Sequence, residues 1–149
     1  MEKVNIFSAE NPEGRVEIGL ARGSTDTIMF IDDLPSGRAS RYHYEYVEEW
    51  LLVVDGSVVL RAPDGEHTLQ RGDLVRFPPG PAGAHKLMNR SESPTRTLWF
   101  SSARAPAVVV YPDSDTIGIF TGDESEDLVF KRSTAVPWAE GEEDWHKGV

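Results

Sequence analysis

Apolar residues recur along the chain in short runs, without helical spacing over any length. Stretches rich in Val, Ile, Phe, Tyr and Trp alternate with turn residues at intervals of about ten, which is typical of an all-β sandwich or barrel. This pattern predicts an all-β fold. The predicted strands are Val16–Ala21, Thr27–Ile31, Ser40–Tyr46, Trp50–Val54, Ser57–Arg61, His67–Leu69, Asp73–Phe77, His85–Asn89, Thr95–Ser101, Ala107–Tyr111, Thr116–Phe120 and Leu128–Arg132.

Turn residues divide these strands. Asp55-Gly56 and Asp64-Gly65 supply the positive φ angles that tight hairpins require. The prolines between Pro78 and Gly83 cannot donate ladder hydrogen bonds, so this run predicts an exposed or edge connection between two strands. The run Trp50–Val54 is apolar at every position. It therefore predicts a strand covered on both faces, by the barrel interior and by a dimer interface.

Length and charge narrow the classes of protein. The 149 residues fit one domain, so we expect a single barrel with N-terminal strands over 1–136 and an acidic, fraying tail over 137–149. The chain has no apolar run of about 18 residues and no secretory signal at its start, which predicts a cytoplasmic protein without a membrane partner. The net charge is −10 and no Lys/Arg cluster is present. Nucleic acid is therefore not an expected partner.

Two of the four histidines stand out as candidate metal ligands. His67 follows a hairpin turn and His146 lies in the charged tail, so both are expected to be solvated. His43 and His85 instead lie within predicted strands, near carboxylates or the proline-rich loop. The chain has no cysteine, so a metal ion must be held by nitrogen and oxygen ligands, which suit divalent Mn, Fe, Ni, Cu or Zn.

Strand geometry relates His43 to two glutamates. Successive side chains of a strand point to opposite faces, so His43 and Glu45 should project side by side. Glu49 shares their parity, yet an unbroken strand would place it about 20 Å from His43 at about 3.3 Å per residue. The chain must therefore bend within Tyr46–Glu48 if Glu49 is to reach the same ion.

Two segments resemble the motifs of the cupin family. Gly37–Gly56 fits Gly-x5-His-x-His-x3-Glu-x6-Gly, with Glu45 where the second histidine usually stands. Gly72–Asn89 is similar to Gly-x5-Pro-x-Gly-x2-His-x3-Asn, with its histidine two residues late. The matching positions are Gly37, His43, Glu49 and Gly56 in the first motif, and Gly72, Pro78, Gly80, His85 and Asn89 in the second. Tyr42–Glu45, Glu48–Val53, Gly80–His85 and Tyr111–Asp115 further resemble a group of small bacterial cupins, a likeness that implies no particular reaction.

The resemblance implies a double-stranded β-helix, a jelly-roll barrel, and a metal site. Its ligands would be His43, Glu45, Glu49 and His85, two neutral imidazoles and two carboxylates that neutralise one divalent ion. This ligand set favours Mn²⁺ or Fe²⁺, with Zn²⁺ or Ni²⁺ as alternatives. Two positions of an octahedral ion would stay open for water or a chelating substrate. A barrel in which Glu45 has abolished metal affinity is the alternative, and similar cupins are commonly homodimers.

Further residues are candidates for binding a small-molecule ligand. Arg41 shares the parity of His43 and could hold an anionic substrate group, or it could pair with Glu48 or Glu49. By strand parity, Leu51, Val53, Phe77 and Leu87 should form an apolar wall. Asn89 could bond either backbone or ligand, while Tyr42, Tyr44 and Trp50 should pack away from the metal ligands. The segment Asp113–Asp115 is predicted to be a solvated turn.

Three functional hypotheses follow from the sequence. The leading one is a metal-dependent enzyme of oxygenase or isomerase type that acts on a small oxygenated or anionic molecule. The second is a non-catalytic cupin that binds or senses a small molecule, with or without metal. The third is a structural dimer with a degenerate pocket. The cupin fold hosts all of these, so fold and motif leave the reaction open.

Overall fold

A computed structural model describes residues 3–10 and 14–140 of the chain. Its strands form sheets of five (β1-β2-β9-β4-β7), four (β12-β11-β10-β3) and three strands (β6-β5-β8). The strands are β1 (Arg15–Glu17), β2 (Thr27–Leu34), β3 (Tyr44–Glu45), β4 (Glu49–Asp55), β5 (Ser57–Ala62), β6 (Gly65–Gln70), β7 (Leu74–Phe77), β8 (Lys86–Met88), β9 (Thr95–Ser102), β10 (Ala107–Tyr111), β11 (Thr116–Phe120) and β12 (Leu128–Lys131). All pairings between them are antiparallel, and the arrangement is a jelly-roll barrel.

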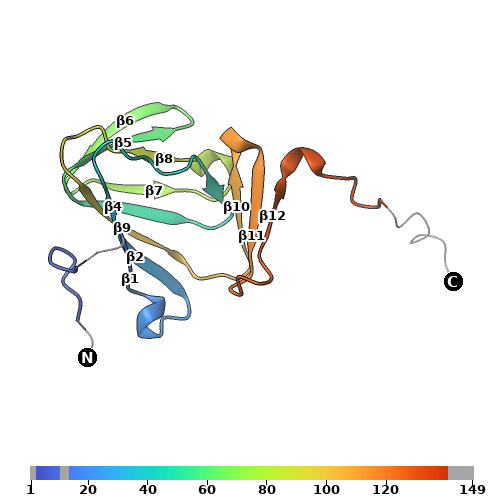
Figure 1. Ribbon diagram of the computed structural model, residues 1–149, viewed down its shortest axis with the longest axis horizontal. Helices are drawn as coiled ribbons and strands as arrows, with labels where there is room; N and C mark the ends of the chain where they lie inside the picture. Colours follow the sequence, from blue (N-terminus) through green and yellow to red (C-terminus); the bar gives the residue numbers. More distant parts are fainter. Residues whose placement is uncertain (1–2, 11–13, 141–149) are drawn as a thin grey trace.

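The hydrophobic core lies between two of the sheets. Figure 1 shows the β6-β5-β8 sheet lying over β7 and β4, with β10, β11 and β12 standing at one end of the barrel. Side chains from both layers meet in one buried cluster, as expected for strands that alternate their faces. Its buried members are Leu34, Leu51, Val53, Val58, Leu60, Leu69, Phe77, Leu87 and Trp99.

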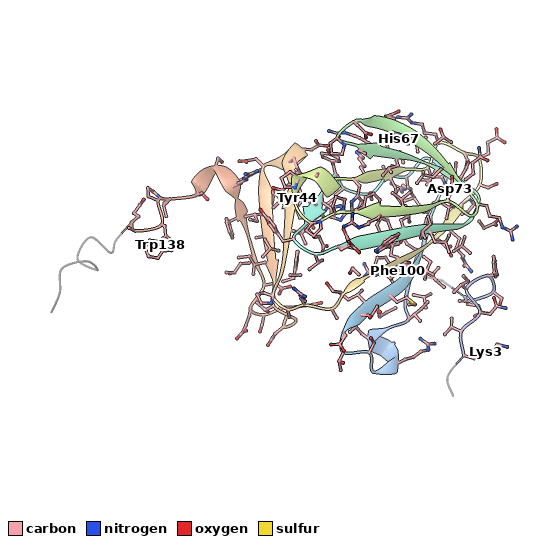
Figure 2. The ribbon with its side chains drawn as sticks, turned by 180° about the vertical axis from the view of Figure 1, so that it is seen from behind. Lys3, Tyr44, His67, Asp73, Phe100 and Trp138 are labelled. Atoms are coloured by element: carbon pink, nitrogen blue, oxygen red, sulfur yellow. The ribbon has the colours of Figure 1, made fainter. Side chains whose placement is uncertain are left out.

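A smaller cluster attaches the β10-β11 sheet to the barrel. Buried Tyr44 packs there with Ala84 and Val110, and Figure 2 shows Tyr44 where this sheet meets the barrel. The proline-rich loop is tied to β3 because the backbone N–H of Gly80 donates a 2.7 Å hydrogen bond to the carbonyl of Glu45. This contact fixes the loop that precedes His85.

The predicted strands are confirmed, with two corrections. The segment Val16–Ala21 is a strand only to Glu17, because a 3₁₀ turn at Leu20–Arg22 follows. The segment Ser40–Tyr46 is not a continuous strand: β3 covers Tyr44–Glu45, and His43 forms an isolated bridge to His85. Before β3, Ser40 and His43 donate separate backbone hydrogen bonds to the carbonyls of Leu87 and His85. The predicted proline-rich connection contains a 3₁₀ turn at Pro81–Gly83.

The C-terminal segment runs away from the barrel. After β12, a 3₁₀ turn at Arg132–Thr134 leads to Trp138, whose side chain is exposed and lies far from the body in Figure 2. Residues 141–149, which hold most of the predicted acidic tail and His146, lie outside the described residues. No helix among the described residues has the length and apolar character needed to cross a membrane.

Candidate metal centre

Three sequence segments bring His43, Glu49 and His85 together. The backbones of His43 and His85 exchange two hydrogen bonds, of 3.0 and 2.8 Å, so the two residues lie directly opposite each other in an antiparallel bridge. The chain then bends at Tyr46–Val47, as the sequence predicted, and Glu49 begins β4 between Phe77 of β7 and Ser101 of β9. The bend replaces the long unbroken strand that would have carried Glu49 out of reach.

The side chains of these three residues converge on a common point. One ligand atom from each of His43, Glu49 and His85 lies within 4.8 Å of the other two. The Nε2 atom of His85 is 3.8 Å from a carboxylate oxygen of Glu49, which is too long for a hydrogen bond. Such spacing fits ligands that surround a divalent ion, because bonds of about 2.0–2.2 Å place neighbouring ligand atoms a few ångströms apart.

Hydrogen bonds to backbone carbonyls fix the tautomers of both histidines. Nδ1 of His43 is 3.0 Å from the carbonyl oxygen of Arg41, and Nδ1 of His85 is 2.9 Å from that of Gly83. A carbonyl can only accept, so the proton of each neutral ring sits on Nδ1 and Nε2 carries a lone pair. This second hydrogen bond is how metal-binding histidines are usually oriented.

The Nε2 atom of His85 is buried without a hydrogen-bond partner in the described structure. The side chain is fully buried, and its ring stacks on Phe77 with centroids 3.9 Å apart. The rings of Trp99 and His43 also lie against the His85 ring, with centroid distances of 5.3 and 4.5 Å. A buried polar atom without a partner is costly, and a metal ion would satisfy this one. The donor set therefore fits a divalent cation.

Burial sets the charges of these groups. It lowers the pKa of His85 to about 3, with His43 adding to the effect and the Gly83 carbonyl opposing it. Burial also lowers the pKa of His43, so both imidazoles are neutral at neutral pH. The pKa of Glu49 is raised to about 8, mainly by burial and further by the charge of Glu45. The metal-free site thus holds a proton on Glu49 that a cation must displace.

Comparison with known proteins identifies the family. Residues 30–101 match the model of the Cupin domain family. The chain is a cupin-domain protein. This span contains His43, Glu49 and His85, so the match and the converging ligands concern the same part of the cupin. No curated protein matches the chain.

Solved structures similar to this cupin cover most of its length. One is described as a sugar phosphate isomerase from a cupin superfamily, from Silicibacter pomeroyi, with a TM-score of 0.77, 24% identity, and coverage of 93% of this chain and 98% of its own. A provisionally assigned sugar phosphate isomerase from Acidithiobacillus ferrooxidans has a TM-score of 0.72, 23% identity, and coverage of 85% and 83%. The polyketide cyclase RemF from Streptomyces resistomycificus has a TM-score of 0.58, 18% identity, and coverage of 72% and 83%. At these identities the likeness establishes the fold.

Beside the ligand group lies a cavity of about 460 Å³, which we call the metal cavity. His43, Glu45 and Glu49 line it, so the fourth ligand predicted for this cupin lies in the same space, although Glu45 is not part of the three-residue group. Burial raises the pKa of Glu45, and the charge of Arg15 opposes this. Glu45 is therefore placed beside the ligand group, and whether it binds the ion stays a prediction.

The other residues predicted to bind substrate are placed differently from one another. Leu87 lines the metal cavity. Leu51 is buried in the core, where Phe77 also lies and stacks on His85. The side-chain amide of Asn89 donates to the carbonyls of Leu34 and Ser93, so it ties backbone segments together. Arg41 lines an adjoining cavity that is described below.

Several side chains lie away from the ligands, as the sequence predicted. Tyr44 packs in the smaller cluster with Tyr42 against it. The ring of Trp50 stacks on Phe100 at 6.0 Å. His67 is exposed and bonds Asp64 at 3.0 Å. The segment Asp113–Asp115 is an exposed turn that begins within the 3₁₀ turn at Pro112–Ser114.

Sequence reasoning missed several polar residues of the metal cavity. Arg15, Asp32 and Tyr111 all line it. Burial raises the pKa of Asp32, the Arg15 charge lowers it and the Asp33 charge raises it further. Asp32 interrupts the apolar run of β2, and an acid within a covered strand is a signal that could have identified it. Arg15 and Tyr111 carry no comparable signal.

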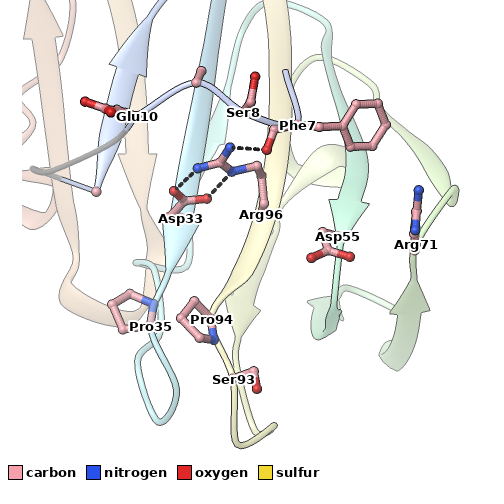
Figure 3. Close-up of a pocket in the computed structure, with 12 residues that line it drawn as sticks. Phe7, Ser8, Glu10, Asp33, Pro35, Asp55, Arg71, Ser93, Pro94 and Arg96 are labelled. Atoms are coloured by element: carbon pink, nitrogen blue, oxygen red, sulfur yellow. Dashed lines mark hydrogen bonds and ion pairs between the residues drawn. The ribbon is translucent and has the colours of Figure 1, made fainter. Parts of the chain in front are cut away.

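A larger cavity, of about 970 Å³, lies elsewhere, beneath the N-terminal segment. Figure 3 shows Arg96 at its centre, bonded to both carboxylate oxygens of Asp33 and to the carbonyl of Phe7. The two Arg96–Asp33 bonds are 2.7 and 2.6 Å long. This bidentate pair uses the charge of Arg96 internally, and among the described residues the carboxylates of this cavity form no group that could hold a metal ion.

Proposed function

We propose that this cupin is a metal-dependent isomerase that acts on a small hydroxy-carbonyl compound, such as a sugar derivative. The observation that carries the proposal is the convergence of His43, Glu49 and His85 within 4.8 Å, with Nε2 of His85 buried and unpartnered. Two of the three residues, His43 and Glu49, line a cavity that is also lined by Glu45 and Asp32. A metal ligand group beside further carboxylates suits a proton transfer between adjacent carbons of a polarised substrate.

The ligand atoms indicate which ion would fit. Two imidazole nitrogens and the carboxylate of Glu49 favour Mn²⁺ or Fe²⁺, with Zn²⁺ or Ni²⁺ as alternatives. A divalent ion bound by His43, Glu49 and His85 would supply Lewis-acid polarisation of a substrate carbonyl. The Nδ1 hydrogen bonds to Arg41 and Gly83 hold the two rings ready for this role.

Glu45 would carry the proton in this reaction. It lines the cavity with His43 and Glu49, so its carboxylate faces any molecule bound next to the ligand group. Isomerisation needs a base that takes a proton from the hydroxyl-bearing carbon and returns it to the neighbouring carbonyl carbon, while the hydroxyl proton passes to the former carbonyl oxygen. No external oxidant is consumed. Phe30 and Leu87 line the same cavity and would limit the access of water to the reacting carbons.

Structural neighbours support this choice between the reaction types. Two of them, at TM-scores of 0.77 and 0.72, bear descriptions as sugar phosphate isomerases. The extra carboxylates of the cavity also favour proton transfer, because a carboxylate beside the ligand group can act as a general base. For these two reasons we favour an isomerase over an oxygenase.

Solvent exchange provides the experimental test. Mn²⁺-loaded protein is incubated in D₂O with a panel of aldoses, ketoses and their phosphates, and proton NMR follows deuterium incorporation next to the carbonyl. We expect incorporation with the wild type, and its loss in Glu45→Gln with the metal content unchanged. The matched control is Glu48→Gln, whose exposed side chain bonds Trp50 and Arg76.

The rival functions give different results in the same experiment. Oxygen consumption by the Fe²⁺ form without deuterium incorporation would point to an oxygenase and contradict our proposal. Tight binding of a panel compound without turnover of either kind would favour the non-catalytic cupin. Metal content equal in wild type and Glu49→Gln would remove the metal-dependent functions altogether.

A further inference from the structure

A second cavity, of about 520 Å³, adjoins the metal cavity, and we call it the cationic cavity. The two cavities share Ser40, Tyr111 and Phe120 in their linings. Arg41 and Lys86 also line the cationic cavity. Lys86 directly follows the candidate metal ligand His85 in the sequence. The two cavities are therefore neighbours, with the three shared residues between them.

The charge of this cavity is positive, although the chain carries a net charge of −10. Its lining contains Arg41, Lys86 and one carboxylate, Asp113. Asp113 is already held by Arg61 through two hydrogen bonds, of 2.7 and 3.0 Å. Its pKa is lowered first by the Arg61 hydrogen bonds and less by the charges of Arg61 and Lys86. Within the described residues, neither Arg41 nor Lys86 has an ion-pair partner.

The metal cavity has the opposite charge balance. Three carboxylates line it, Asp32, Glu45 and Glu49, against one cation, Arg15. The Arg15 guanidinium lies 3.5 Å from the centre of the Phe30 ring and 3.8 Å from Glu17. A bound divalent ion would offset the charge of these carboxylates, whereas no carboxylate of the cationic cavity pairs with Arg41 or Lys86, so an anionic substituent would be attracted to the cationic cavity.

Tyr111 lies between the two cavities and lines both of them. The guanidinium of Arg41 is 5.5 Å from the centre of its ring, and that centre is 5.9 Å from the centre of the His43 ring. One aromatic ring therefore separates a free cation from a metal ligand. A chain of a few carbon atoms can cover this span, which is the size of a small sugar.

We propose that the cationic cavity binds the phosphate group of the substrate while the carbonyl end reaches the metal centre. The proposal rests on the proposed function and adds the substrate class, a phosphorylated hydroxy-carbonyl compound. Phosphate fits better than carboxylate because two separate cations and the hydroxyls of Ser40, Ser114 and Thr116 line the cavity. A single bidentate arginine would suffice for a carboxylate.

Phosphorus NMR with inorganic phosphate tests this site apart from catalysis. Phosphate is titrated with metal-free protein and then with Mn²⁺-loaded protein. We expect binding in both forms, weakened at least tenfold in the double variant Arg41→Gln/Lys86→Gln. The control Arg38→Gln/Arg104→Gln removes the same charge from exposed residues outside both cavity linings, and it should bind phosphate as the wild type does.

Each outcome supports or overturns the proposal. Unchanged phosphate affinity in Arg41→Gln/Lys86→Gln, or no phosphate binding by the wild type, would overturn it. Phosphorus relaxation in the Mn²⁺ form that indicates direct coordination of phosphate to the ion would also overturn it. Failure of the proposed function is separately visible as an absence of bound Mn²⁺ in the wild type, because phosphate binding is also measured on the metal-free protein.

Discussion

Replacing Glu49 by Gln should make the metal-free protein more stable. The folded protein keeps a proton on this carboxyl up to a pKa of about 8, against 4.5 as the ordinary value. At pH 7 the unfolded chain is therefore ionised at this position while the folded chain is mostly protonated. Each pH unit of this difference is worth about 1.4 kcal/mol. The ionisable group thus costs the folded state on the order of 3 kcal/mol at pH 7, and Gln removes that cost.

The direction of the Glu49 pKa shift determines how the stability of the metal-free protein depends on pH. A raised carboxyl pKa means that the folded state binds more protons between pH 4.5 and about 8, so wild-type stability falls relative to the variant across this window. Urea unfolding of chelator-treated, metal-free protein at pH 4.5 and pH 7 measures the difference. We expect the two proteins to differ little at the lower pH and by the full amount at the higher.

With added Mn²⁺, the wild type should become more stable than Glu49→Gln. Metal that binds only the folded wild type stabilises it by mass action, whereas Glu49→Gln has lost a ligand and should gain little. Glu48→Gln is the matched control, because hydrogen bonds from Trp50 and Arg76 lower the pKa of exposed Glu48, and its loss should not stabilise the protein. A metal-free Glu49→Gln protein that is no more stable than wild type at pH 7 would refute the reasoning.

Three further predictions concern the same centre. Metal binding should release about one proton per ion near pH 7 and strengthen up to tenfold per pH unit until about pH 8, because the cation displaces the Glu49 proton; calorimetry in buffers of different ionisation enthalpy measures this, and binding without proton release would contradict it. Phe77→Ala should cost about 3 kcal/mol or more in urea unfolding because a buried ring that stacks on His85 is lost; a cost below about 1 kcal/mol would show that the stack is not part of a packed core. Gly83→Ala should lower both stability and Mn²⁺ affinity, since its Cβ would collide with the backbone of Pro78 and displace the carbonyl that bonds His85. Exposed Ala82 in the same turn provides the control Ala82→Ser, and equal Mn²⁺ affinity in the two variants would argue against this role of Gly83.

The sequence was sufficient for the strands and for most of the candidate metal centre. Short apolar runs separated by turn residues located the strands, and several of these strands contribute side chains to the core between two sheets. The spacing of His43 and Glu49 required a bend within Tyr46–Glu48, and the chain bends there. Motif resemblance then added His85, which the fold brings to within bonding range of the same point.

Strand parity was less informative where the ladder is irregular. It placed Glu45 beside His43, and both residues line the metal cavity, but β3 covers only Tyr44–Glu45 and the group of three convergent residues does not include Glu45. The charge balance of the cationic cavity was equally hidden, because Asp113 and Arg61 are far apart in sequence and their pairing leaves Arg41 and Lys86 unneutralised. Such long-range pairs depend on how the sheets are placed against one another.

Metal stoichiometry tests the central claim most directly. The protein is stripped with a chelator, reloaded with Mn²⁺, passed over a desalting column, and its bound metal is counted by elemental analysis. We predict one ion per chain in the wild type and in His67→Ala, whose histidine is exposed, and a loss of most bound metal in His85→Ala. A wild type that retains no metal, or a His85→Ala protein that retains as much as the wild type, would contradict the account.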